Sequence, residues 1–232
     1  MRHLATPYLY IYKKARNLID SGHTIGALNF FFPAKLHFRS ACSNFAKNNR
    51  LMEFIEQNIK GVWLIKPKRF GDERGYFCET FKKEEFEAHV GKINFIQDNE
   101  SLSSQGVLRG LHFQQGEWSQ AKLVRVSQGR VLDVVVDLRG DSPTFGRHVS
   151  VLLDAAQGTQ LFIPRGFAHG FVVLSDLAQF QYKVDNVYAP HSEMTLRFDD
   201  PELGIDWQLP PDKLLLSEKD RHGVALKNIK PF

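Results

Sequence analysis

Residues 158–175, GTQLFIPRGFAHGFVVLS, decide the fold of this 232-residue chain. Two runs of aromatic and aliphatic residues stand on either side of Pro164-Arg165-Gly166, which is a sequence typical of a turn. Gly158, Pro164, Gly166 and His169 satisfy the spacing G-x5-P-x-G-x2-H. We therefore expect a strand that ends at the turn, followed by a strand that carries His169 into the interior of a barrel.

Short runs rich in aromatic and β-branched residues continue on both sides of this stretch, each bounded by turn residues. The predicted strands cover residues 62–65, 76–81, 94–101, 122–127, 130–138, 148–153, 169–175 and 180–188. Only Lys82–Val90 has helical character, because its acidic residues come early and Phe86 stands four residues before Val90. Many short strands with almost no helix predict an all-β, cupin-type jelly-roll barrel with a few short peripheral helices.

The spacing around His169 resembles the second of the two cupin motifs, and an altered first motif precedes it. That first motif reads G-x5-H-x-H-x3-4-E-x6-G, and Gly106, His112 and Gly129 satisfy its opening and its close. Gln114 stands in the slot of the second histidine, and Lys122 stands where the glutamate is expected. Because a lysine ammonium repels a divalent cation and two ligands are lost, we predict no metal site and no cofactor.

The residues that remain suit a different chemistry. His112 can act as a base and Lys122 can stabilise an enolate oxygen, which together favour removal of a proton beside a carbonyl group. Taken singly, a histidine is more often a structural residue and a strand lysine more often points to solvent. Polar groups at Asp72–Gly75 and Gln97–Asn99 lie beside or within apolar runs, and a ligand is one possible partner for them.

Composition excludes several classes of protein. The net charge of +4 belongs to residues 1–50, which carry eight Lys or Arg against one acidic residue, so the remaining 182 residues have a net charge of −3. That distribution argues against a nucleic-acid partner. No apolar run approaches the roughly 20 residues of a membrane helix, which argues against a membrane partner. The two cysteines have no metal-ligand spacing and predict a reducing, cytoplasmic location.

The chain changes character at Met52. Residues 1–51 mix aromatic and basic residues without strand alternation or a sustained helical face. We predict that residues 1–51 are a poorly ordered N-terminal extension, arising from a misassigned start codon, and that residues 52–232 form the jelly-roll domain. A short helical appendage and a mitochondrial presequence are the alternatives for the extension.

Eight segments resemble the dTDP-4-dehydrorhamnose 3,5-epimerase family, in the order and spacing of that family. They are FGDERGYFCET, FIQDN, VLRGLHFQ, KLVRV, DVVVDLR, SPTFG, IPRGFAHGFVVLS and YKVDNVYAPHSE. The resemblance covers about Met52 to Asp220. It implies a jelly-roll homodimer without a metal, which epimerises dTDP-4-dehydro-6-deoxy-D-glucose at C3 and C5 to dTDP-4-dehydro-L-rhamnose, a step toward dTDP-L-rhamnose.

The resemblance also implies residue roles. His112 is the base, Asp220 orients it, Tyr182 returns a proton from the opposite face, and Lys122 lies by the C4 oxygen. The implied substrate-binding residues are Arg74, Phe77, Glu79, Gln97, Asn99, Arg109, Lys122, His169, Tyr188, Glu193 and Lys219. In the family, the strand that bears the counterparts of Arg74 and Phe77 reaches the site of the neighbouring subunit.

Three rival functions remain open at this point. A relative within the fold could epimerise one carbon only or act on another dTDP-4-keto sugar. A metal-dependent cupin oxygenase is disfavoured by Gln114 and Lys122. A non-catalytic sugar-binding barrel would be expected to lose His112 or Tyr182.

Overall fold

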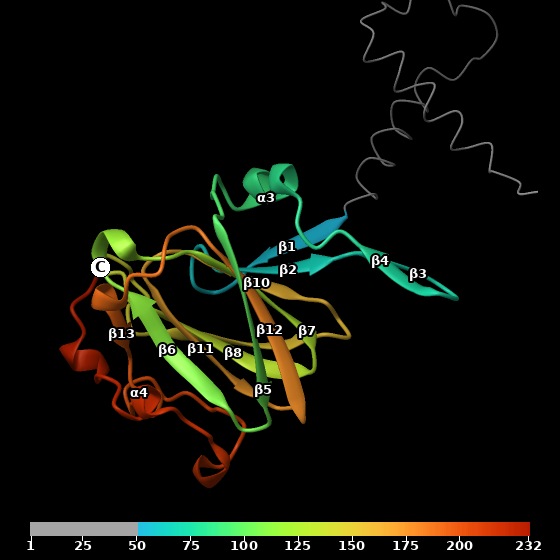
Figure 1. The fold of residues 1–232 in the computed structure, drawn as a ribbon. Coiled ribbons are helices and arrows are strands. Elements are labelled where there is room, and N and C mark those ends of the chain that lie inside the picture. Colours follow the sequence, from blue (N-terminus) through green and yellow to red (C-terminus); the bar gives the residue numbers. More distant parts are fainter. Residues whose placement is uncertain (1–50) are drawn as a thin grey trace, which may run out of the picture. The chain divides into compact units, whose positions relative to one another are not determined.

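A computed structural model describes residues 51–232, which form two antiparallel sheets that face one another (Figure 1). The first sheet has the order β1 (Met52–Glu56), β2 (Trp63–Pro67), β10 (Gln160–Ile163), β7 (Lys122–Gln128), β12 (Leu177–Val184), β5 (Gln97–Ser104). The second has the order β13 (Glu193–Thr195), β6 (Leu108–Gln114), β11 (Phe167–Val173), β8 (Arg130–Asp137), β9 (His148–Asp154). This arrangement, with open sheet edges, confirms the predicted all-β jelly roll.

The main core lies between the two sheets, and β8 shows how the sequence builds it. Val131 and Val135 of β8 belong to the cluster that also contains Phe180 of β12 in the facing sheet. Val134 and Val136, which alternate with them, belong to a second cluster on the other side of the five-stranded sheet. Because successive strand residues point to opposite faces, a run of apolar residues without polar alternation predicts a strand covered on both faces.

Two further segments cover the outer faces of the sheets. The chain after β13 packs Trp207 and Leu226 onto the outer face of the five-stranded sheet (Figure 1). This part includes the short helix α4 (Glu218–Arg221). Helix α3 (Lys83–His89) contributes Phe86 to a third cluster with Met52 and Phe162, which belong to the six-stranded sheet. The predicted helix over Lys82–Val90 is thus confirmed to within a residue at each end.

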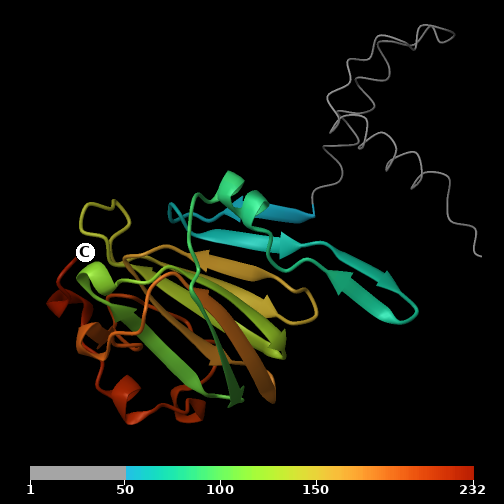
Figure 2. The same ribbon diagram turned by 45° about the horizontal axis from the view of Figure 1, so that its top comes forward.

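A two-stranded hairpin extends away from both sheets (Figure 2). It consists of β3 (Arg69–Asp72) and β4 (Gly75–Cys78). Its aromatic side chains are largely exposed: 60% for Tyr76 and 67% for Phe77. Such exposure in a lone hairpin indicates a surface suited to a partner.

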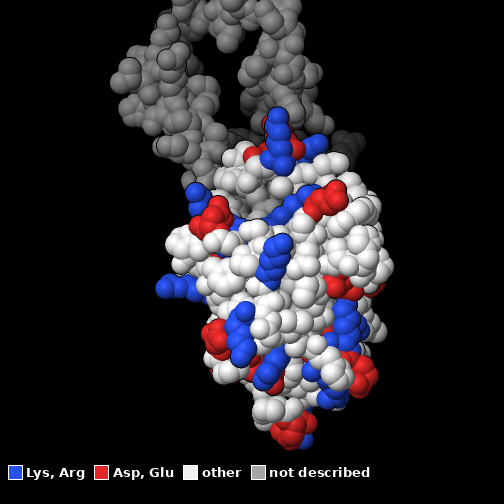
Figure 3. Space-filling model, turned by 90° about the vertical axis from the view of Figure 1, so that its left-hand side faces the viewer, with Lys and Arg blue, Asp and Glu red and all other residues white. Residues whose placement is uncertain are grey.

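The remaining expectations concern a nucleic-acid partner, a membrane partner and the N-terminal extension. On the face in Figure 3, Lys and Arg of the described residues are interspersed with Asp and Glu. No helix within residues 51–232 has the length and apolar character needed to cross a membrane. The predicted extension, residues 1–51, lies outside the described residues apart from its last one, so its nature stays a prediction.

Candidate active site

A cavity of about 190 Å³ opens between the two sheets and brings together residues far apart in the sequence. Among the side chains that line it are Arg109, His112, Lys122, His169 and Tyr182. A smaller adjoining cavity of about 110 Å³ shares three of them and adds Tyr188 and Glu193. Residues predicted to act as base, acid and electrostatic stabiliser therefore surround one space.

His112 is half-buried on β6 and is held by a carboxylate from the C-terminal segment. Its Nε2 lies 2.6 Å from Oδ1 of Asp220. Ser217, the N-cap of α4, donates through its hydroxyl to the other carboxylate oxygen at 2.7 Å. Burial raises the pKa of Asp220, but the hydrogen bonds from His112 and Ser217 outweigh it and hold that pKa below 3.8. An ionised Asp220 fixes the Nε2–H tautomer, which leaves Nδ1 of His112 as the nitrogen that can take a proton.

A bulge in β6 turns both Arg109 and His112 toward the cavity. On β11, His169 pairs with His112 and Phe171 pairs with Arg109, so two steps on β11 match three on β6. In a regular strand, residues three apart would face opposite sides. The extra residue is Gly110, where a Cβ would lie only 2.5 Å from the Cα of Gly170. The bulge requires two glycines in contact, one on each strand.

Tyr182 lines the cavity from β12, in the opposite sheet to His112. Its pKa is raised by burial, and the charge of Arg109 opposes that effect. The hydroxyl therefore stays protonated at neutral pH and can donate a proton. Arg109 is itself positioned by Ser103 of β5, whose Oγ accepts from its Nε at 3.1 Å.

Lys122 lines both cavities at the start of β7. Burial lowers the pKa of its ammonium from 10.5 to about 8, while Asp133 and Glu193 favour the charged form. A lysine with a pKa near 8 remains mostly an ammonium group at neutral pH. Such a weakly solvated cation can stabilise an oxyanion that forms in the cavity.

A second polar cluster stands at the cavity mouth. Glu193 lies 2.5 Å from Nζ of Lys219 and accepts a hydrogen bond of 2.7 Å from the hydroxyl of Tyr188. Burial raises the pKa of Glu193, but these two partners outweigh it and lower that pKa. The cluster joins three of the predicted binding residues.

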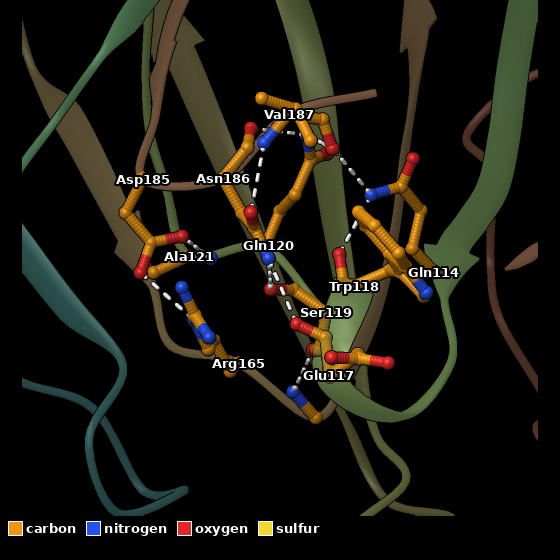
Figure 4. A network of polar contacts seen from close by, with 11 residues as sticks. Gln114, Glu117, Trp118, Ser119, Gln120, Ala121, Arg165, Asp185, Asn186 and Val187 are labelled. Atoms are coloured by element: carbon orange, nitrogen blue, oxygen red, sulfur yellow. Dashed lines mark hydrogen bonds and ion pairs between the residues drawn. The ribbon is translucent and has the colours of Figure 1, made fainter. Parts of the chain in front are cut away.

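Gln114 stands where the cupin motif has its second histidine. Its side chain connects the loop after β6 to the loop after β12 through hydrogen bonds (Figure 4). Its amide nitrogen donates to the backbone oxygens of Trp118 at 2.7 Å and Val187 at 3.0 Å. Its amide oxygen accepts from the backbone nitrogen of Ala189 at 2.7 Å. These three bonds brace the loop that carries Tyr188.

Asp185 extends this network to a third loop (Figure 4). Its carboxylate accepts from the backbone nitrogen of Ala121 at 2.7 Å and from Nε of Arg165 at 2.8 Å. Within residues 51–232, no three His, Cys, Asp or Glu side chains converge in a way that could hold a metal ion. At the two positions that differ from the cupin motif, Gln114 therefore holds a loop in place and Lys122 supplies a cation in the cavity.

Not all of the predicted site residues lie together. Arg74 and Phe77 lie on the exposed hairpin, where Arg74 pairs with Asp72, and neither lines the two cavities. Gln97 donates to Asn99 at 2.8 Å on β5. Glu79 follows β4 and has a buried oxygen without a partner within the described residues. None of these five residues lines the two cavities.

Two functional-site neighbours were missed by the sequence prediction. Ser217 holds Asp220, and its place just before an acidic short helix is a typical N-cap signal. Asp133 is buried behind the cavity and accepts a hydrogen bond of 2.9 Å from Nε2 of His169. The presence of carboxylates in the valine-rich run Arg130–Leu138, at Asp133 and Asp137, was the signal that could have identified it.

Comparisons with known proteins agree with this geometry. A family model described as dTDP-4-dehydrorhamnose 3,5-epimerase matches residues 56–228. The dTDP-4-dehydrorhamnose 3,5-epimerase of Escherichia coli (strain K12) is 50% identical over 179 residues, covering 77% of this chain and 96% of that protein.

Solved structures are similar over the same share of the chain. The dTDP-4-dehydrorhamnose 3,5-epimerase from Elizabethkingia anophelis NUHP1 has a TM-score of 0.75 at 48% identity, covering 77% of this chain and 98% of that one. The dTDP-6-deoxy-D-glucose-3,5-epimerase from Legionella pneumophila Philadelphia 1, in complex with dTDP-4-keto-L-rhamnose, has a TM-score of 0.74 at 46% identity. That match covers 77% of this chain and 95% of the Legionella chain.

Proposed function

The chain belongs to the dTDP-4-dehydrorhamnose 3,5-epimerase family, and we propose that the cavity between its sheets is where the family reaction takes place. The protein is an isomerase that epimerises dTDP-4-dehydro-6-deoxy-D-glucose at C3 and C5. The product is dTDP-4-dehydro-L-rhamnose, which leads to dTDP-L-rhamnose. The observation that carries the site assignment is the 2.6 Å pair of His112 and Asp220, in which His112 lies on the opposite sheet to Tyr182.

His112 starts the reaction by removing a proton from carbon. The C4 ketone of the sugar acidifies the hydrogens at C3 and C5, and Nδ1 of His112 takes one of them. The electron pair of the broken C–H bond forms a carbon–carbon double bond to C4, and the π pair of the C4 carbonyl moves to its oxygen, which gives an enolate. Asp220 stabilises the imidazolium that results, because its carboxylate accepts from Nε2.

Lys122 and Tyr182 complete the inversion. The Lys122 ammonium stabilises the enolate oxygen, and the protonated Tyr182 hydroxyl returns a proton to carbon from the other face. Inversion needs two groups on opposite faces, since one group alone tends to return the proton to the face it left. Once His112 has released its proton to solvent and Tyr182 has regained one, the same cycle acts at the second carbon.

The remaining predicted residues are proposed to bind the nucleotide portion. Arg109 and His169 suit the diphosphate, because a guanidinium matches phosphate oxygens. Tyr188 suits a stacked thymine at the mouth, beside the ion pair of Glu193 and Lys219. Gln97 and Asn99 offer amide groups to the same nucleotide.

A homodimer accounts for the residues on the hairpin. Arg74, Phe77 and Glu79 lie on or beside β4 and do not line the cavity of their own subunit, so we propose that they reach the cavity of a second copy. The exposed aromatic rings of the hairpin support this arrangement. The cysteine pattern supports a cytoplasmic location for the protein.

Hydrogen exchange in deuterated water tests the roles of the two catalytic groups. His112→Asn should neither invert the keto sugar nor exchange its C3 and C5 hydrogens, because no enolate forms. Tyr182→Phe should still exchange them, with configuration largely retained. Product and exchange are read by NMR, and His89→Asn, an exposed histidine on α3, is the matched control that should behave as wild type.

Two outcomes would contradict these assignments. Exchange by the His112 variant would show that another group is the base. Rapid, complete inversion by the Tyr182 variant would show that water or another residue returns the proton.

A further inference from the structure

Asp133 is a buried carboxylate that stands between two core valines on one face of β8. It lies in the middle of β8, and Val131 and Val135, its neighbours on the same face, belong to the core between the sheets. Its exposed fraction is 0%. Burying a carboxylate costs free energy unless hydrogen bonds or an opposite charge compensate it. The partners of Asp133 therefore indicate what its charge does.

The carboxylate has a hydrogen bond on one oxygen only. Oδ2 accepts from Nε2 of His169 at 2.9 Å, and within residues 51–232 Oδ1 is a buried acceptor without a partner. Burial lowers the pKa of His169, although Asp133 acts in the opposite direction. A neutral His169 leaves the negative charge of Asp133 without a compensating positive charge, so a cation is needed nearby.

Lys122 on β7 is the cation that meets this need, because it lines the same cavity as His169, the hydrogen-bond partner of Asp133. Among the charged groups around it, Asp133 on β8 has the largest influence in favour of the ammonium form. Glu193 on β13 acts in the same direction and Lys219 on α4 acts against it. The other titratable groups that line the same two cavities are Glu100, Arg109, His112, His169, Tyr182 and Tyr188.

Glu193 is less able to serve as the counter-charge. Its carboxylate already pairs with Lys219 at 2.5 Å and accepts from Tyr188 at 2.7 Å. Asp133 has only a neutral imidazole as hydrogen-bond partner and is completely buried, where a charge is least screened.

We propose that Asp133 is a positioning residue for the reaction: its carboxylate fixes the ring of His169 and supplies the counter-charge that keeps Lys122 an ammonium group. Asp133 is not among the residues that line the cavity, and it acts through two residues that are. The proposal rests on the proposed function in one respect, which is the role of Lys122 beside the C4 oxygen.

The test deletes the charge of Asp133 and measures the titration of Lys122. Asp133→Asn keeps the size of the side chain, and its amide oxygen can still accept from His169. Lysine labelled with ¹³C at Cε is followed by NMR across pH without substrate, and Lys122→Met assigns the signal. Loss of a close opposite charge should lower the pKa of Lys122 by about 1 to 3 units. The alkaline limb of kcat should move to lower pH by the same amount.

Two further variants separate charge from structure. Asp133→Val continues the valines of the strand face and deletes the charge in a second way, so it should reproduce the shift even if the asparagine variant does not fold. Asp137→Asn removes another buried carboxylate from the same strand, away from the cavity, and should leave the titration of Lys122 unchanged.

The outcomes distinguish this inference from the proposed function. An unchanged Lys122 titration in the Asp133 variants would overturn the counter-charge, even if turnover fell. Full turnover by Lys122→Met would instead refute the role of Lys122 in the reaction, and with it the positioning role of Asp133, whatever the titration shows.

Discussion

Replacing Asp137 by asparagine tests how a buried carboxylate at the end of β8 stabilises the fold. The carboxylate accepts hydrogen bonds from the side chains of Arg139, Ser142 and Thr144 at 2.6 to 2.9 Å. Its side chain is fully buried. Burial opposes ionisation, but the hydrogen bonds from those three residues outweigh it and lower the pKa of Asp137 from 3.8 to about 2.

This pKa difference sets the expected magnitude. A shift of about 1.8 units corresponds to about 2.4 kcal/mol of folding free energy at neutral pH, since one unit is worth about 1.36 kcal/mol. Because the pKa is lower in the folded state, the contribution is present above the unfolded value near 4 and is lost as the pH falls toward 2. At pH 3 about 1.3 kcal/mol should remain.

Urea denaturation at fixed protein concentration measures this difference. The gap in unfolding free energy between wild type and Asp137→Asn should be about 2.4 kcal/mol at pH 7 and about half of that at pH 3. Turnover at pH 7 should be unchanged, because Asp137 does not line the cavity. A gap that is independent of pH would refute the electrostatic reasoning and assign the loss to packing.

Three other perturbations test the site. Asp220→Asn should lower kcat about a hundredfold or more with little change in KM, because the tautomer of His112 is no longer fixed; steady-state kinetics that show a change in KM alone would contradict this. Gln114→Leu should raise KM more than it lowers kcat, since the Tyr188 loop loses its brace, and an unaltered KM would show that the loop is held in another way. Exhaustive chelation should leave activity intact with no stoichiometric transition metal by elemental analysis; recovery of a chelator-inactivated protein on adding iron, zinc or manganese would refute this.

The sequence predicted best the strands that are apolar on both faces. The prediction over residues 130–138 matches β8 to within one residue, because its apolar residues need burial on both sides. Strand β6 was not predicted, although it carries His112. Its bulge at Gly110 breaks the two-residue period, and Arg109 interrupts the apolar run. The alternation of polar and apolar residues cannot predict β6, because its pairing with β11 depends on the contact between Gly110 and Gly170.

The sequence predicted those site residues that stand at positions of the cupin motif. His112 and Lys122 stood at recognisable positions, and both line one cavity. Asp220 is 108 residues from His112, so only the family resemblance could connect them. Asp133 was overlooked, since a carboxylate inside a valine-rich strand shows that a buried charge exists without showing which cation compensates it.

The bulge in β6 also decides how this cavity can be redesigned. Side chains of β6 that face the cavity come from positions 109, 112 and 114. A mutagenesis library that assumes a two-residue period from His112 would vary Gly110 and Leu108 instead. At Gly110 any side chain meets the backbone of Gly170, and Leu108 packs into the cluster on the outer side of the sheet. Deleting residue 110 would remove the bulge and leave Arg109 two positions before His112, so both side chains would still face the cavity in a regular strand. The cavity therefore tolerates a shorter β6 better than a side chain at position 110.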